Sequence, residues 1–124
     1  MKPILLVDDS TTMLASLTGI LSKVGYAFAT APDGPTAIAK VQSGLSPSLI
    51  ITDYHMPGMN GVELIAQLRR LAPTRFTPIL VLTTDSQQEK RGAAKAAGAT
   101  GWLVKPVDAL ALVQVVKQVV VNAA

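Results

Sequence analysis

Short apolar runs alternate with amphipathic segments along the whole chain, and this alternation predicts the fold. Four runs of four or fewer aliphatic or aromatic residues each lead into polar residues: Ile4–Val7 into Asp8 and Asp9, 49–51 into Thr52 and Asp53, 79–82 into Thr83, and Gly101–Val104 into Lys105. Residues 26–30 form a further predicted strand. Runs of this length, bounded by polar residues, are typical of buried strands.

The segments between these strands have the 3.6-residue period of helices. Met13, Leu14, Leu17, Ile20, Leu21 and Val24 form one stripe, which Gly25 ends. Further helices are predicted from Pro35 to about Gln42, over 61–71, over 87–97 behind the capping-box spacing of 86–89, and from Asp108 to about Val121. Strands that alternate with helices favour an α/β fold, a doubly wound parallel sheet covered on both faces.

Composition limits the class of protein further. The 124 residues predict one domain over 1–124 with no output domain, and 49% hydrophobic but only 4% aromatic residues predict an aliphatic core. The absence of cysteine excludes disulfides and thiolate zinc sites. The first strand follows the N-terminus directly and the apolar runs are too short to cross a bilayer, so we expect a cytoplasmic protein without membrane insertion.

The net charge of +3 does not by itself indicate a partner. Two basic groups stand out, one formed by Arg69, Arg70 and Arg75 and one over residues 90–95. Neither is interleaved with aromatic residues or accompanied by a nucleic-acid-binding motif. We therefore expect a solvated basic surface and no nucleic-acid partner.

The polar residues at the strand ends predict a reactive crevice, because the carboxyl ends of parallel strands share one edge of a sheet. Two carboxylates about 5 Å apart repel each other by roughly 3 kcal/mol at an effective dielectric near 20. Lys105 offers one compensating charge, and Mg²⁺ is the natural second, since it prefers hard oxygen ligands and also binds phosphate. Asp53 is then the candidate nucleophile for phosphorus, with Thr83 and Lys105 holding phosphoryl oxygens.

Each of these residues alone has a simpler role open to it. Asp8, Asp9 and Ser10 can serve only to start a helix, and residues 83–86 can form only a capping segment. Lys105 followed by proline carries almost no information alone. The joint occurrence of an acid pair, a lone acid, a hydroxyl and a lysine at four separate strand ends is what favours a site.

The same residues resemble a known family, the receiver domain of two-component response regulators, and most closely its single-domain CheY-type chemotaxis receivers. The resemblance covers nearly the whole chain and is carried by residues 6–10, 53–61, 82–84 and 98–106. It implies a flavodoxin-like five-stranded sheet of order 2-1-3-4-5. It also implies that Asp53 accepts a phosphoryl group from the phosphohistidine of a sensor histidine kinase. Mg²⁺ is then held by Asp9, Asp53 and the backbone carbonyl of His55, with Asp8 assisting through water.

Two positions, those of His55 and Trp102, depart from the commonest pattern of that family. His55 lies two residues beyond the acceptor, and we hypothesise that it and Asp85 tune dephosphorylation. Trp102 stands where receivers usually carry a switching tyrosine or phenylalanine. It is expected either to switch less completely or to remain at the surface as a docking anchor, and simple packing is the third alternative. The Lys105–Pro106 bond is expected to be cis.

The resemblance implies a phosphorylation-activated signalling switch, with chemotaxis as its process and a flagellar motor component as one possible kind of target. By the same resemblance, the protein is expected to catalyse only its own phosphoryl transfer and dephosphorylation and otherwise not to be an enzyme. The helices over 87–97 and 108–121 are the expected output surface. The second has more apolar residues than one buried face needs, which indicates either a partner or self-association site or additional burial within the monomer.

Three other functions remain open. An aspartyl-phosphate phosphohydrolase of the HAD-like class would share the chemistry, but it needs a second acid where His55 stands. A flavodoxin-like cofactor binder could use the hydroxyls of 10–12, yet Asp8 and Asp9 repel an unmetallated phosphate. A phosphate-independent adaptor would have no use for the complete set of reactive residue types.

Overall fold

A single parallel sheet forms the centre of the molecule. The computed structural model describes residues 2–83, 88–105 and 107–123. Its five strands lie in the order β2-β1-β3-β4-β5, which confirms the predicted topology. Their bounds are β1 Ile4–Val7, β2 Phe28–Ala31, β3 Leu49–Asp53, β4 Ile79–Thr83 and β5 Gly101–Val104.

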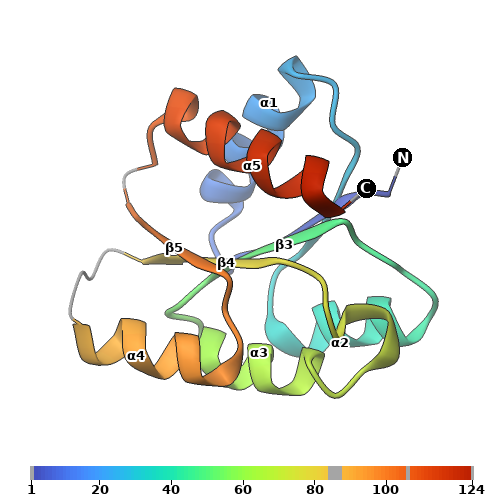
Figure 1. The fold of residues 1–124 in the computed structure, drawn as a ribbon, viewed down its shortest axis with the longest axis vertical. Coiled ribbons are helices and arrows are strands. Elements are labelled where there is room, and N and C mark those ends of the chain that lie inside the picture. The colour runs from blue at the N-terminus through green and yellow to red at the C-terminus, as the bar shows by residue number, and fades with distance from the viewer. Residues whose placement is uncertain (1, 84–87, 106, 124) are drawn as a thin grey trace.

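Helices cover both faces of the sheet, as Figure 1 shows. On one face lie α1 (Thr11–Lys23) and α5 (Ala109–Ala123), and on the other lie α2 (Gly34–Gln42), α3 (Gly61–Leu68) and α4 (Gln88–Ala97). Alternate residues of β1 point to opposite faces, so Ile4 and Leu6 pack with α1 and α5 while Leu5 and Val7 pack on the α2 and α3 side. The aliphatic core predicted from composition is therefore split into two layers.

Several predicted boundaries differ from the structure by one to three residues, and local contacts explain two of the differences. The second strand begins at Phe28 instead of residue 26, because Tyr26 donates its N–H to the Leu21 carbonyl in the turn that ends α1. The third helix ends at Leu68, and a 3₁₀ turn over Ala72–Thr74 follows. The N–H groups of Arg70 and Leu71 donate to the carbonyls of Gln67 and Leu68, three residues back, so the chain tightens after Leu68 and the α-helix ends there.

Helix starts follow the predicted capping chemistry where they are described. The Ser10 hydroxyl accepts the N–H of Met13 at 3.2 Å, and Asp108 accepts the N–H of Ala111 at 3.0 Å. Asn60 and Glu63 form a complete capping box at α3. The capping segment expected before α4 includes residues 86 and 87, which lie outside the described residues.

The apolar surplus of α5 is largely used within the monomer. Leu112, Val116 and Val120 are buried, and Val115 and Val119 pack partly against the same core layer. Among the large apolar side chains of α5 up to Val120, Leu110 is the exception at 66% exposure. In the part of the chain that the structure describes, no helix combines the length and apolar character that crossing a bilayer requires.

Candidate functional site

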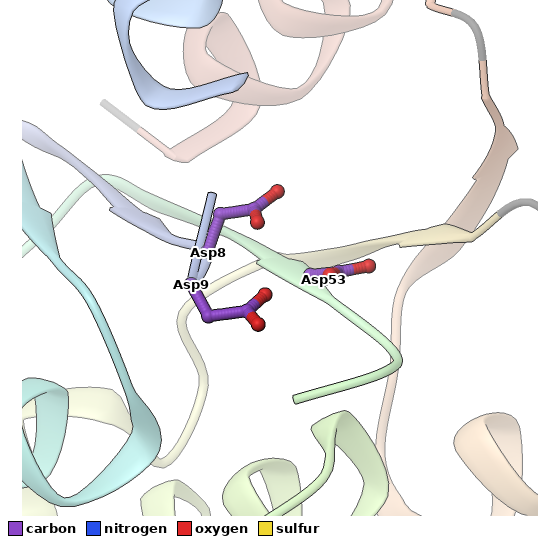
Figure 2. A group of neighbouring side chains, drawn as sticks. All are labelled: Asp8, Asp9 and Asp53. Atoms are coloured by element: carbon purple, nitrogen blue, oxygen red, sulfur yellow. The ribbon is translucent and has the colours of Figure 1, made fainter. Parts of the chain in front are cut away.

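Three carboxylates gather where β1 and β3 end. Val7 pairs with Thr52 in the register of these neighbouring strands, so Asp8 and Asp53 follow side by side. Asp8 and Asp53 are buried, at 1% and 6% exposure, whereas Asp9 is exposed. One carboxylate oxygen from each of the three residues lies within 4.8 Å of the others (Figure 2). The convergence predicted from the strand ends is confirmed.

Lys105 directly follows β5, and its side chain contacts two of the three carboxylates. Its ammonium nitrogen Nζ lies 3.1 Å from Asp53 Oδ1 and 3.3 Å from Asp8 Oδ2. Its backbone N–H donates to the Thr83 carbonyl at 2.6 Å, which holds the lysine against the end of β4. Thr83 itself is fully buried. All five residues expected at the crevice therefore lie at one edge of the sheet.

Electrostatics at this edge oppose ionisation of one acid and favour ionisation of the lysine. Burial raises the pKa of Asp8, the Ser10 N–H at 2.9 Å counteracts this, and the charge of Asp53 raises the pKa further. For Lys105, burial alone would lower the pKa. The hydrogen bond and charge of Asp53, and then those of Asp8, outweigh that effect and raise it. One ammonium group thus only partly compensates the carboxylates.

The loop after Asp53 is fixed by backbone contacts that depend on a glycine. Tyr54 donates its N–H to the Leu82 carbonyl at 2.8 Å, and Gly61 donates to the Tyr54 carbonyl at 2.8 Å. A Cβ atom at Gly61 would lie only 2.7 Å from the Asp53 carbonyl oxygen. The sequence identifies Gly61 only as the start of a helix. Its role in holding the loop depends on a contact that no local pattern reveals.

The donor set at this edge fits a hard divalent cation. Carboxylate oxygens are the ligands that Mg²⁺ prefers, and three of them converge with a single ammonium as counter-charge. In addition, Asp9 is exposed, so an ion with several bound waters can reach the group. The exposed ring of His55 is not part of this group of possible ligands.

Aromatic side chains extend from the site toward β5. The ring of Tyr54 lies 4.8 Å from that of His55 and 5.8 Å from that of Trp102, measured between centroids. Trp102 is half-buried and packs on the core layer beneath α4, where it lines a hollow of about 250 Å³ with Ala94 and Lys95. Trp102 is therefore partly exposed, and switching, docking and simple packing all remain predictions for it.

Two residues named in the sequence predictions are not placed. Asp85 and Pro106 lie outside the described residues, so the expected tuning position and the expected cis bond remain predictions.

Comparison with known proteins identifies the family. The response regulator receiver domain matches residues 4–117. This chain belongs to that family. Protein PilH of Pseudomonas aeruginosa is 34% identical over 119 residues, covering 96% of this chain and 98% of PilH. Chemotaxis protein CheY of the same organism is 32% identical over 117 residues, covering 94% of each chain.

A solved structure of a related protein has the same fold as this receiver domain. Chemotaxis protein CheY4 of Vibrio cholerae is 41% identical, with a TM-score of 0.91, and the match covers 96% of this chain and 98% of CheY4. Receiver domains are signalling switches of two-component systems rather than metabolic enzymes, and they bind Mg²⁺ at an acidic pocket. CheY-like receivers work with sensor histidine kinases and downstream targets.

Proposed function

We propose that this receiver domain is a phosphorylation-activated switch in which Asp53 accepts a phosphoryl group from the phosphohistidine of a sensor histidine kinase. The observation that carries the proposal is the contact of Lys105 Nζ with Asp53 Oδ1 at 3.1 Å, beside two further carboxylates. An Asp53 oxygen forms the new bond to phosphorus. The nitrogen–phosphorus bond of the donor breaks, and its electron pair returns to the imidazole ring.

The residues around Asp53 have separate roles in this step. Lys105 and the Thr83 hydroxyl hold phosphoryl oxygens, and Asp8, Asp9, Asp53 and the His55 carbonyl hold Mg²⁺, with Asp8 acting through water. When bound, Mg²⁺ neutralises charge that develops on the phosphoryl oxygens. The burial of Asp8 and Asp53 supports these roles, because charge interactions strengthen as water is excluded.

Incubation with acetyl phosphate and Mg²⁺, followed by intact mass measurement, tests the acceptor. The wild type is expected to gain one phosphoryl group and Asp53→Ala none. Asp33→Asn is the matched control, because Asp33 caps α2 through the Thr36 N–H and lies outside the carboxylate group, so it should be labelled like the wild type. Equal labelling of Asp53→Ala and wild type would refute the assignment.

The same chain is proposed to hydrolyse its own phosphoryl group at a rate set by His55 and Asp85. Two observations support this role for His55: it follows the acceptor by two residues, and its side chain is exposed and so open to contact with water. Substitutions His55→Asn and Asp85→Ala are expected to change the phosphoryl lifetime. Unchanged lifetimes in both variants would discard the idea.

We propose that this receiver domain signals through protein contacts made by α4, β5 and α5. The proposed process is chemotaxis in the cytoplasm, and the proposed kind of target is a flagellar motor component. The exposed Leu110 on α5 and Val104 at 40% exposure on β5 support a contact surface there. Self-association through the same surface is tested by sedimentation of wild type and Leu110→Ser, with and without beryllofluoride. Identical sedimentation of all samples as monomers would exclude self-association.

A further inference from the structure

Charge divides the molecule along the strand direction. The six acidic residues with described side chains all lie at the carboxyl ends of the strands or at the helix starts that follow: Asp8, Asp9, Asp33, Asp53, Glu63 and Asp108. The segments that lead into the five strands, residues 2–3, 24–27, 43–48, 69–78 and 98–100, contain no Asp or Glu. They contain Lys2, Arg69, Arg70 and Arg75. The amino-terminal edge of the sheet is therefore basic and free of acids.

One aromatic side chain projects from this basic edge. Phe76 is 90% exposed, far more than any other large apolar side chain among the described residues. Phe76 borders a hollow of about 200 Å³, whose other lining residues include Lys2, Pro47, Pro73 and Pro78. A protruding ring next to a proline-lined hollow is a two-part surface that a complementary partner can engage at both points.

Side-chain hydrogen bonds tie the loop that carries Phe76 to its surroundings. Arg69 Nη1 donates to the carbonyls of Thr74 at 2.8 Å and Thr77 at 2.6 Å, on either side of the phenylalanine. The Thr77 hydroxyl donates to the Pro73 carbonyl at 3.2 Å, and the Thr74 hydroxyl donates to that of Leu68. Because the loop is already ordered, a partner that contacts Phe76 loses little conformational entropy. Aromatic side chains on ordered loops are typical anchors of protein interfaces.

We infer that Phe76, the adjoining proline-lined hollow and the cations Lys2 and Arg75 form a docking surface for an acidic segment of a partner protein that carries apolar side chains. Charge complementarity selects an acidic partner, since this edge offers cations and no carboxylate. The hollow needs a convex side chain to fill it, which a bilayer surface does not supply. A single exposed phenylalanine offers no platform for successive bases.

This surface lies at the opposite edge of the sheet from Asp53, so docking should not depend on phosphorylation. A short synthetic peptide of glutamates with central leucines is the probe, titrated into ¹⁵N-labelled full-length protein at low salt. Amide shifts are expected at Lys2, Ser48 and within 72–78. Phe76→Ser should weaken binding about tenfold, as loss of an anchor does, while leaving the unfolding transition unchanged because its ring is exposed.

Matched variants show whether the peptide binds at Phe76 and the adjoining hollow. Leu110→Ser, which removes an exposed apolar side chain elsewhere, and Asp53→Ala should bind the peptide like the wild type. Four results would each overturn the inference. The amide shifts map to another region, or none appears at millimolar peptide. Phe76→Ser binds the peptide as tightly as the wild type, or a leucine-free peptide binds as well as the original one. Binding to phosphatidylglycerol vesicles that needs Phe76, without peptide binding, would replace it with a membrane surface. Acetyl phosphate labelling of Asp53 is unaffected by any of these results.

Discussion

The two edges of the sheet handle charge in opposite ways. At the carboxyl edge, three carboxylates and one ammonium are held together, and burial and charge repulsion raise the Asp8 pKa. At the amino edge, the guanidinium of Arg69 donates five hydrogen bonds to the carbonyls of Thr74, Arg75, Thr77 and Gly98. One edge concentrates charge of one sign, whereas the other uses a cation to tie neutral backbone groups together.

This difference separates reactivity from stability within one small domain. Loss of the Arg69 guanidinium at the amino edge is expected to lower the free energy of unfolding and leave phosphoryl transfer intact. Substitutions at the carboxyl edge are expected to alter phosphoryl transfer, and one of them should raise stability. Four predictions test this contrast.

Arg69→Ala should have the largest effect on stability, lowering the free energy of unfolding by about 3 kcal/mol. The substitution leaves partly buried carbonyls of two loops, including those of Thr74 and Gly98, without their charged donor. Urea unfolding measures the loss, and acetyl phosphate labelling should persist under folded conditions. Arg70→Ala is the control, since this neighbour is exposed and should change stability by less than about 0.5 kcal/mol. Equal losses in both variants would contradict the role of Arg69.

Gly61→Ala should lower stability by about 2 kcal/mol and also slow phosphoryl transfer. The added Cβ would press against the Asp53 carbonyl oxygen and the Tyr54 backbone, so the acceptor loop must shift. Gly19→Ala, within α1, is the control: its Cβ meets nothing within 4 Å, and it should stabilise the helix by up to about 1 kcal/mol. Normal labelling of Gly61→Ala would show that the acceptor tolerates this shift.

Asp8→Asn should raise the free energy of unfolding by about 1 kcal/mol at neutral pH, because it removes a carboxylate whose ionisation the folded state disfavours. Because the pKa of Asp8 is raised in the folded state, ionisation of Asp8 lowers the free energy of unfolding of the wild type. Below the ordinary carboxyl pKa of 3.8 the wild type and the variant should differ least, and the advantage of the variant should grow as Asp8 ionises. Mg²⁺ should stabilise the wild type more than the variant. Urea unfolding at several pH values, with and without Mg²⁺, measures both effects, and a less stable variant at neutral pH contradicts the prediction.

The smallest expected effect is spectroscopic. Beryllofluoride with Mg²⁺ should change the fluorescence of Trp102, the only tryptophan in the sequence. The centroid of the Trp102 ring lies 5.8 Å from that of Tyr54, and Tyr54 directly follows the acceptor Asp53. Asp53→Ala should show no change, and Phe76→Ser should respond like the wild type. A constant spectrum in the wild type at saturating beryllofluoride would mean that Trp102 does not respond to the acceptor.

Much of the site could be predicted because a parallel sheet converts strand order into proximity. Asp8, Asp53, Thr83 and Lys105 each follow or end a strand, so the topology alone brings them to one edge. The hydrogen bonds of Arg69 could not be predicted in this way. In the sequence Arg69 belongs to a solvated basic group with Arg70 and Arg75, and only the packing of α3 against the loops before β4 and β5 makes it half-buried.

The sequence by itself determined the alternation of elements, the aliphatic core and the set of reactive residues, because hydrophobic period and residue type are local properties. Tertiary structure decided which cation faces which oxygen, why Gly61 must lack a side chain, and that Phe76 projects beside a proline-lined hollow. These features depend on distances between segments far apart in the chain, and such distances are set by how helices pack on the sheet.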